Sequence, residues 1–500
     1  MKIRNIFLGI VSLLMAASCT NLDEKLYDKV SSSDYGKTPS EIETIVGRAY
    51  ASLRGFSDEI SNAFPTCEFV LFLSETTSDE ACIPTRGADW YDEGRYQEAQ
   101  FHTWSPQNLL VLSAWRYSYT GINKINLIID QVNKSELSDD EKAVVNAELR
   151  GVRAYYYYML LDLYGNVPIT TSVSNTEGIS NSPRSEVYAF VESELLEILD
   201  LLPAEKLYGR FTQNVANTLL ARLYINSEVY IGQARWDDCI EACDRVKGYQ
   251  LEPNYFTNFL TENENSQENI WVIPYDSKEG TVGNFFASLS FHYKQKQAFS
   301  ATSNYTDCVN GICLQPGVYS AFDDTDIRKQ GFLEGDQISL ATGSVILMDN
   351  GTPLTYTEAI IDYTAASQNE GVRIKKYEVK EGETWERDHD FVLMRYAEIL
   401  MMKAECYMRM GAPVMARQMV VQIRDRANVE TPADIDLEFI DQEWLREFTL
   451  EGLRRSVNIR MGDWFKPWWN KDATPEYRAL FPIPQYELDL NSNLVQNPGY

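Results

Sequence analysis

The sequence predicts a mostly α-helical protein: a scaffold of tetratricopeptide-like helical pairs with a large, irregular, loop-rich insertion that contains short β-strands. Three observations support this fold class. A long helix with clear start and stop signals lies over 138–163. Two segments, from Leu219 and from Leu400, share an alanine, aromatic, glycine, alanine order followed by a second amphipathic helix, as in degenerate tetratricopeptide repeats. The stretch between them, 249–390, has no helical period.

The long helix over 138–163 has the clearest local signals in the chain. Ser138 and Glu141 have the spacing of a capping box, and Gly165 followed by Pro168 ends the helix, which gives about 26 residues or about 39 Å. The four tyrosines at 155–158 have the appearance of a binding strip. We expect them to be core instead, because two apolar stripes run side by side on this helix: Leu149, Val152, Tyr156, Leu160 and Leu163, and Ala154, Tyr155, Tyr158 and Leu161.

The N-terminal half combines one loop-rich stretch with several helices. Pro39 suits the first turn of a helix and predicts one over 39–54. Glycine, proline and aspartate punctuate 56–106, which predicts loops. Further helices are predicted over 108–132, 184–202, 211–231 and 236–247. Because the joints are short, we expect antiparallel pairs.

The C-terminal half contains the irregular insertion, 249–390. Short β-rich runs at 269–275 and 372–377 are separated by polar loops, and Trp271 alternates as a buried strand residue would. A long irregular insertion in a helical body usually carries function. Helices are predicted to resume at Phe391 and again over 442–460, and the proline-containing segment 461–500 is predicted to be mostly extended.

The first residues predict export. Lys2 and Arg4 precede an apolar run that ends in Ser18-Cys19, which is a signal peptide over 1–18 and too short to span a bilayer permanently. Small residues before Cys19 resemble a bacterial lipobox, in which this cysteine carries the lipid; the alternative is an ordinary signal peptide with an incidental cysteine. The acidic residues Asp23 and Glu24 resemble a signal for the cell surface.

Composition excludes one class of partner and disfavours another function. A formal net charge of -28, with no basic run, argues against nucleic-acid binding. No HExxH, GxSxG, GxGxxG or phosphate-loop motif occurs, so we expect no enzyme. Glu398 and Glu405 share a helix face and would be the carboxylates of a glycosidase, but such spacing is common in internally paired helices.

The sequence indicates neither a metal nor another cofactor. His102, His292 and His389 are isolated from one another, which disfavours zinc. The cluster of Asp323, Asp324 and Asp326 lacks the rest of a calcium loop and is expected to be a solvated turn. Among the cysteines, spacing allows local bridges between Cys67 and Cys82 and between Cys308 and Cys313, whereas Cys239, Cys243 and Cys406 lie on helical patterns and are expected to be buried thiols.

The best candidates for a ligand-binding surface lie in two regions without helical period. In the first loop region, Trp90 and Tyr91 lie among charged residues, and aromatic residues in aperiodic loops have less reason to be core; the alternative is that Trp90 plugs the loop onto the body. In the insertion, the aromatic and amide side chains of Tyr293, Asn304, Tyr305 and Trp385 are surface candidates. We select a ligand-binding set of Arg86, Asp89, Trp90, Tyr91, Tyr293 and Tyr305.

Several motifs in order give the chain a family resemblance. They are Cys19 after the signal, AWRYSYTGIN from Ala114, AELRGVRAYYYYMLLDLYGNVPI from Ala147, RFTQNVANTLLARLY from Arg210, VLMRYAEILMMKAE from Val392, LEGLRR from Leu450, and FPIPQYEL with the terminal QNPGY. Together they resemble the SusD/RagB family of Bacteroidetes outer-membrane lipoproteins. The chain departs from the family pattern at Glu443-Trp444 and near Val457.

The resemblance implies a domain organisation and a function. The domain would be a single SusD-like unit over 19–500, divided into 19–106 with the lipidated terminus and first loops, helical pairs over 107–248 and 391–460, the insertion 249–390, and the extended 461–500. It implies a surface-exposed, lipid-anchored glycan-binding protein that delivers its ligand to a SusC-like TonB-dependent transporter in the outer membrane. Three alternatives stay open: peptide uptake by the same fold, a purely structural role at the transporter, and an extracellular glycoside hydrolase.

Overall fold

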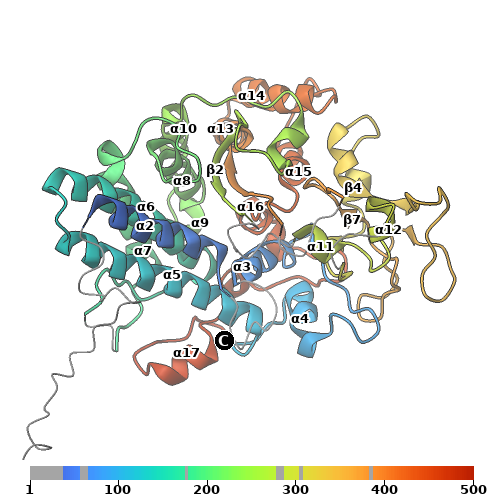
Figure 1. Ribbon diagram of the computed structural model, residues 1–500, viewed down its shortest axis with the longest axis horizontal. Helices are drawn as coiled ribbons and strands as arrows, with labels where there is room; N and C mark the ends of the chain where they lie inside the picture. The colour runs from blue at the N-terminus through green and yellow to red at the C-terminus, as the bar shows by residue number, and fades with distance from the viewer. Residues whose placement is uncertain (1–37, 57–65, 175–177, 277–285, 303–307, 382–386) are drawn as a thin grey trace, which may run out of the picture.

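The computed structural model describes residues 38–56, 66–174, 178–276, 286–302, 308–381 and 387–500. A mostly helical body occupies the left and top of the molecule in Figure 1, and the irregular insertion lies at the right. The fold class predicted from the sequence is therefore confirmed, including short strands within the insertion.

The helices of the body account for most of the regular structure. They are α2 (Pro39–Ala51), α3 (Thr66–Glu75), α4 (Arg95–Phe101), α5 (Leu109–Lys134), α6 (Asp139–Leu163), α7 (Arg184–Ile198), α8 (Gln213–Ile225), α9 (Ser227–Ile231), α10 (Trp236–Arg245), α13 (Tyr396–Arg409), α14 (Pro413–Arg426), α15 (Leu437–Phe448), α16 (Arg454–Met461) and α17 (Gln485–Leu490). The helices α5, α6 and α7 pack in succession, α8 packs on α10, and α13 packs on α14. Contacts between α10 and α13 join the two repeat-like pairs into one scaffold.

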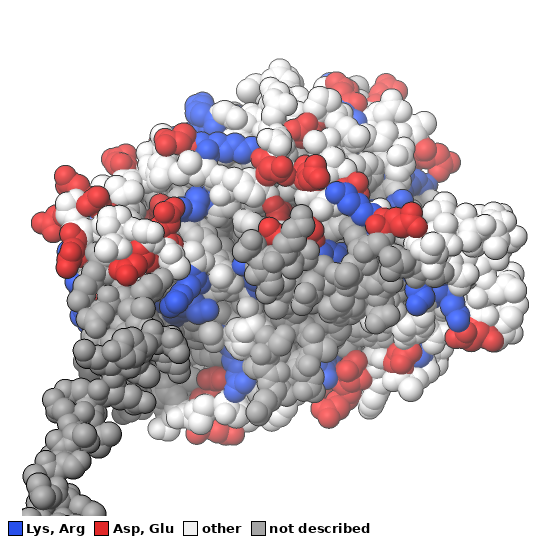
Figure 2. Space-filling model, viewed as in Figure 1, with Lys and Arg blue, Asp and Glu red and all other residues white. Residues whose placement is uncertain are grey.

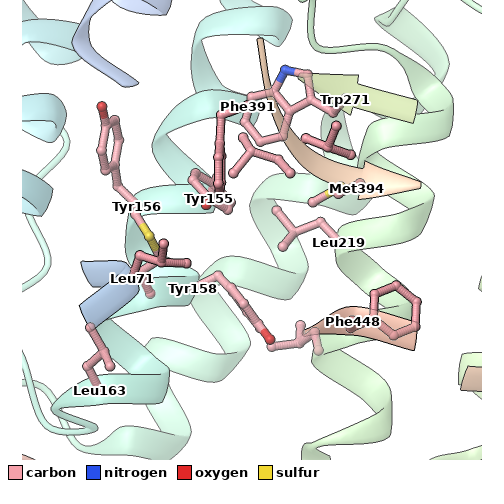
Figure 3. Packing of buried hydrophobic residues seen from close by; sticks show 14 of the residues in the cluster. Leu71, Tyr155, Tyr156, Tyr158, Leu163, Leu219, Trp271, Phe391, Met394 and Phe448 are labelled. Carbon is pink, nitrogen blue, oxygen red and sulfur yellow. The ribbon is translucent and has the colours of Figure 1, made fainter. Parts of the chain in front are cut away.

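Helix α6 is the central helix of the body, as its sequence predicts. The Ser138 hydroxyl accepts the Glu141 backbone N–H at 3.3 Å, while Glu141 accepts the Ser138 N–H at 2.8 Å, so the capping box is formed. Gly165 adopts a left-handed conformation with φ +72° just beyond the helix. All four tyrosines at 155–158 are buried; in Figure 3 the Tyr155 ring lies near Trp271, whereas the Tyr156 ring points to the other side of α6. The core interpretation of this helix is confirmed.

The described part of the insertion contains two short α-helices and short strands, some of which pair with strands outside it. Four two-stranded antiparallel sheets are described: β1 (Ala81–Cys82) with β3 (Cys313–Leu314), β2 (Asn269–Ile273) with β8 (Phe391–Arg395), β4 (Phe332–Leu333) with β7 (Arg373–Ile374), and β5 (Gly335–Asp336) with β6 (Thr355–Tyr356). The helices are α11 (Phe286–Ser290) and α12 (Lys296–Phe299). Trp271 on β2 is 1% exposed and belongs to the core, as predicted.

Three sequence-based boundaries are wrong. The stretch 56–106 contains α3 and α4, because its apolar run packs as a helix against α5. Residues 391–395 form β8 rather than the start of a helix, since they pair with β2. The helix predicted over 442–460 is two helices, α15 and α16, separated where Leu450 and Gly452 have φ of +61° and +80°.

A buried ion network fastens the insertion to the body. Arg328, in the insertion, is 1% exposed and pairs with Glu443 at 2.7 Å and Glu447 at 2.8 Å, both on α15. Arg395, at the end of β8, also pairs with Glu447, at 2.5 Å. Breaking such a pair by removing one partner costs about 3–5 kcal/mol, because the other charge is left buried. The network therefore fixes where the insertion lies on the scaffold.

Candidate functional site

The first loop region and the insertion meet at one exposed contact. The Tyr293 hydroxyl donates a hydrogen bond to the Asp89 carboxylate at 2.6 Å, although the two residues are 204 positions apart. Tyr293 is 37% exposed and Tyr91, two residues after Asp89, is 53% exposed. The structure thus brings Asp89 and Tyr293 together and leaves the rings of Tyr91 and Tyr293 exposed to solvent.

The loop that carries Asp89 and Tyr91 has an unusual backbone. It begins with a tight hairpin in which Arg86 and Asp89 exchange backbone hydrogen bonds at 2.9 and 3.2 Å. Trp90, Asp92 and Glu93 then adopt positive φ of 61°, 41° and 59°. Non-glycine residues rarely adopt such angles, and they persist where the surroundings force them, often at ligand sites. Backbone strain therefore concentrates in the segment that presents Tyr91.

Arg86 does not face the surface, contrary to the sequence-based selection. It is 1% exposed, and its guanidinium donates to the backbone carbonyls of Ser367 at 2.5 Å and Glu370 at 2.8 Å. Burial, together with the nearby charge of Arg373, lowers the pKa of Arg86 to about 10, so the side chain stays protonated at neutral pH. Arg86 is an interior support that ties the loop to the insertion.

Trp90 is also largely enclosed. It is 9% exposed, its indole N–H donates to the Val309 carbonyl at 2.7 Å, and its ring lies edge-on to Tyr96 with centroids 5.6 Å apart. Gly311 lies against the ring so closely that an added Cβ would be 2.6 Å from a ring carbon. The alternative interpretation, a plug that holds the loop onto the body, describes this contact better than a stacking platform does.

The insertion side of the site is built around Tyr293. Partial burial and the hydrogen bond to Asp89 raise the pKa of the Tyr293 hydroxyl, which stays protonated as a donor. The preceding residue, His292, is 3% exposed, and burial with nearby arginines lowers its pKa to about 4, so it is neutral at pH 7. Lys294 forms an exposed ion pair with Asp349 at 2.6 Å. No sequence pattern pointed to Asp349, which lies in a polar turn.

Four predicted residues lie outside the described part of the chain. These are Cys19, Asn304, Tyr305 and Trp385. The lipid-attachment residue and one member of the ligand-binding set, Tyr305, therefore stay predictions.

The disulfide expectations are wrong in this structure. Cys82 and Cys313 each carry a free thiol, so neither the Cys67–Cys82 nor the Cys308–Cys313 bridge is formed. Spacing along the chain suggested two local pairs. The fold instead places one cysteine from each suggested pair on neighbouring strands, so that Cys82 lies opposite Cys313 in the β1–β3 register. Cys239, Cys243 and Cys406 are buried thiols, as predicted.

The charged groups offer little for metal or carboxylate chemistry. Among the described residues, no group of three or more metal-ligating side chains lies close enough to hold an ion. Asp326 is buried, and its carboxylate pairs with the Arg328 guanidinium at 2.7 Å. The cluster of Asp323, Asp324 and Asp326 is therefore only partly the solvated turn expected from the sequence. Glu398 is paired with Arg222 at 2.5 Å and Glu405 with Arg460 at 2.9 Å, which makes both internally paired carboxylates, as predicted. In Figure 2, lysines and arginines are scattered among acidic residues on the visible face.

A separate cavity lies inside the helical body. It has a volume of about 90 Å³, and its described lining includes Tyr117, Tyr155, Tyr158 and Phe391 but none of the predicted site residues. For comparison, an apolar cavity of about 150 Å³ in another protein holds one benzene molecule. The space is too small for a sugar ring, so it does not compete with the exposed surface as a glycan site.

Comparison with known families gives two matches in order along the chain. Residues 72–225 match a family described as starch-binding and associating with the outer membrane, and residues 342–462 match the SusD family. The starch-binding protein SusD of Bacteroides thetaiotaomicron is 28% identical over 470 residues, covering 82% of each chain. The SusD-like protein P2 of Formosa agariphila is 25% identical and covers 98% of each. No helix within the described residues is long and apolar enough to cross a membrane.

Solved structures share the fold. A laminarin-binding SusD-like protein superimposes with a TM-score of 0.74 at 21% identity, covering 93% of this chain and all, 100%, of the other. The surface glycan-binding protein A of Bacteroides thetaiotaomicron, solved with laminarihexaose, gives 0.73 at 22% identity and covers 92% and 100%. These neighbours are helical proteins, and the superpositions show that this chain shares their fold. From these sequence and structural matches, the chain belongs to the SusD/RagB family.

Proposed function

We propose that this protein captures glycans at the surface formed by Asp89, Tyr91 and Tyr293 and passes them to a SusC-like TonB-dependent transporter. The observation that carries the proposal is the Asp89–Tyr293 hydrogen bond, which joins the two predicted regions and leaves the Tyr293 ring exposed, with a second exposed ring, Tyr91, two residues after Asp89. Relatives named as binders of starch and laminarin support a carbohydrate as the ligand class.

The exposed groups suit a sugar chemically. The C–H face of a pyranose ring packs on a tyrosine ring, while hydroxyls exchange hydrogen bonds with carboxylates and ammonium groups. Tyr91 and Tyr293 supply the rings. Asp89, which is hydrogen-bonded to Tyr293, and the ion pair of Lys294 with Asp349, which begins at the residue after Tyr293, supply the polar groups. Arg86 and Trp90 hold the loop from beneath. Tyr305 remains a proposed member of the surface.

The proposed location is the cell outer membrane, with a lipid on Cys19 as anchor. The signal-like N-terminus supports export, and the match to an outer-membrane-associated starch-binding family supports this membrane. Family membership supports the proposed transporter partner. The domain boundaries given by the sequence are retained in this proposal, with 19–500 as one unit.

We propose binding without catalysis. The two relatives named above for starch and laminarin are named as binding proteins. The carboxylates singled out as a glycosidase pair, Glu398 and Glu405, each have a buried arginine partner, which leaves neither positioned as a general acid.

Binding is tested with the purified protein by titration calorimetry against laminarin oligosaccharides, starch oligosaccharides and mixed peptides. Stacking on one aromatic ring contributes about 0.5–1.5 kcal/mol beyond buried area, and 1.4 kcal/mol is tenfold in affinity. We therefore expect Tyr91→Ala and Tyr293→Ala each to weaken glycan binding by roughly tenfold. Tyr293→Phe, which removes only the hydrogen bond to Asp89, should cause a smaller loss.

Tyr208→Ala is the matched control. Tyr208 is 38% exposed and also donates its hydroxyl to a side chain, Asn263 at 3.1 Å, but it lies on the connection before α8. Glycan affinity should be unchanged in this variant. Wild-type glycan affinity in both the Tyr91→Ala and the Tyr293→Ala variants would reject the site. Binding of peptides alone would favour the peptide-uptake alternative. Turnover of the oligosaccharides would favour the glycoside hydrolase alternative.

A further inference from the structure

The two strands that join the first loop region to the insertion carry one cysteine each. Cys82 on β1 and Cys313 on β3 are direct partners in the antiparallel register, and their Sγ atoms are 3.9 Å apart. Both side chains are fully buried. Two thiols face each other across strands that are 231 positions apart in the chain.

We propose that Cys82 and Cys313 form a cross-strand disulfide in the oxidised protein. Directly opposed residues of antiparallel strands have Cα atoms about 4.5–5.5 Å apart, inside the range of about 4.4–6.8 Å found in disulfides. Their side chains point to the same face of the pair. The sulfurs need only rotate and approach from 3.9 Å to about 2.05 Å.

The surroundings also suit the reaction. The Arg86 guanidinium donates to the Cys313 sulfur at 3.5 Å, which favours the thiolate that attacks an oxidant. Burial alone would raise the pKa of Cys313, but the hydrogen bond with the Cys82 thiol, together with the positive charge of Arg86 and Arg373, lowers it to about 6. Once the bond forms, Arg86 keeps its two carbonyl acceptors.

The reaction is a thiol–disulfide exchange. Each thiol gives up its proton, the two sulfurs form one S–S bond, and two electrons reduce a disulfide-class oxidant, such as oxidised glutathione, to two thiols. Because both sulfurs are buried in the folded protein, we place the exchange during folding, while β1 and β3 are still pairing. An oxidising compartment after export would supply such an oxidant.

The bond would act directly beneath the candidate site. The hairpin that begins at Arg86 starts four residues after Cys82, and Cys313 lies in the insertion that carries Tyr293. A covalent link here fixes the loop against the insertion whether or not the Asp89–Tyr293 hydrogen bond is made. This consequence for ligand affinity rests on the proposed function, whereas the bond itself does not.

The test is disulfide mapping of the full chain after refolding with oxidised glutathione. Remaining thiols are blocked with N-ethylmaleimide in denaturant, the chain is cut after glutamate so that Glu68, Glu75 and Glu80 separate Cys67 from Cys82, and the peptides are weighed and fragmented. We expect the Cys82 peptide to be joined to the Cys313 peptide, with a mass two hydrogens below the sum. Reductant should lower the unfolding temperature of this protein by several degrees.

Four variants make the assignment specific. Cys82→Ser and Cys313→Ser should each abolish the linked peptide and the effect of reductant, whereas Cys67→Ser and Cys308→Ser should retain both. Blocked Cys82 and Cys313 in the refolded wild-type chain, or loss of the link in either control variant, would overturn the proposal. Mapping the wild-type chain needs no variant to fold, and its outcome is independent of any glycan titration.

Discussion

Replacing Tyr156 with alanine removes a fully buried ring from the centre of α6. Its ring lies edge-on to Tyr117 with centroids 5.2 Å apart, and its hydroxyl hydrogen-bonds the Ser52 hydroxyl at 2.9 Å. Aromatic-to-alanine changes in a core cost about 3–5 kcal/mol, so we expect a loss of about 4 kcal/mol in the free energy of unfolding.

The expected shift in unfolding temperature follows from chain length. Globular proteins unfold with an entropy of about 2.1 cal/mol/K per residue, or about 1 kcal/mol/K for 500 residues. Tyr156→Ala should therefore lower the Tm by about 4 °C, and Tyr156→Phe, which removes only the hydrogen bond, by about 1 °C. Differential scanning calorimetry measures both.

The matched comparison is Tyr91→Ala, which truncates a tyrosine that is 53% exposed. This variant should keep the wild-type Tm within about 1 °C, because surface changes cost about 0.5 kcal/mol or less, and should lose glycan affinity. The reverse result for Tyr156→Ala, an unchanged Tm with lost ligand binding, would refute the assignment of the four tyrosines to the core and return them to the site.

Three further predictions concern the interior. Gly121→Ala places a Cβ 2.2 Å from the Tyr156 ring, so calorimetry should show a loss of about 1–3 kcal/mol from overpacking; wild-type stability would contradict this packing. Neighbouring arginines outweigh burial and lower the pKa of Glu443 to about 2. The contribution of ionised Glu443 to the free energy of unfolding is therefore complete above about pH 4.5 and is lost as the pH falls toward 2. Urea titrations that show constant stability over this range would disprove it. Burial raises the pKa of Glu75, which lies beside the Glu80 carboxyl, to about 7. The contribution of protonated Glu75 to the free energy of unfolding is complete below about pH 4.5 and is lost as the pH rises through 7. Glu75→Gln should flatten that decline, whereas an unchanged pH profile in the variant would argue against this assignment.

Local signals predicted the helices well where they were complete. The capping box at Ser138, the glycine stop at Gly165 and two apolar stripes together specify α6 to within about a residue or two at each end. In contrast, a short apolar run can be either a strand or a buried helix, and only its neighbours decide. The run at 69–73 became part of α3, whereas 391–395 became β8 because β2 lies beside it.

Contacts between distant segments account for the remaining errors. The α15–α16 break is held by the buried carboxylates of Glu75 and Glu80, which accept the backbone N–H groups of Gly452 and Leu450. No pattern near residue 450 indicates these partners. Likewise, Arg86 and Asp89 were both predicted from the sequence to bind ligand. In the structure, Arg86 is buried because its guanidinium donates to backbone carbonyls near residue 370, whereas Asp89 stays at the surface. The sequence pattern does not distinguish these two residues, and only the folded chain shows that Arg86 is buried whereas Asp89 is exposed.

The separation between Asp89 and Tyr293 has a consequence for the order of folding. Contacts between residues 204 positions apart form late, because a long loop must close before they stabilise anything. The helices α5, α6 and α7 rely on neighbours in the chain and can assemble earlier. A chain truncated before residue 293 would lack half of the ligand surface however well its helices pack. At the proposed surface, glycan capture would therefore be acquired late in folding, once the part of the insertion that carries Tyr293 has reached Asp89.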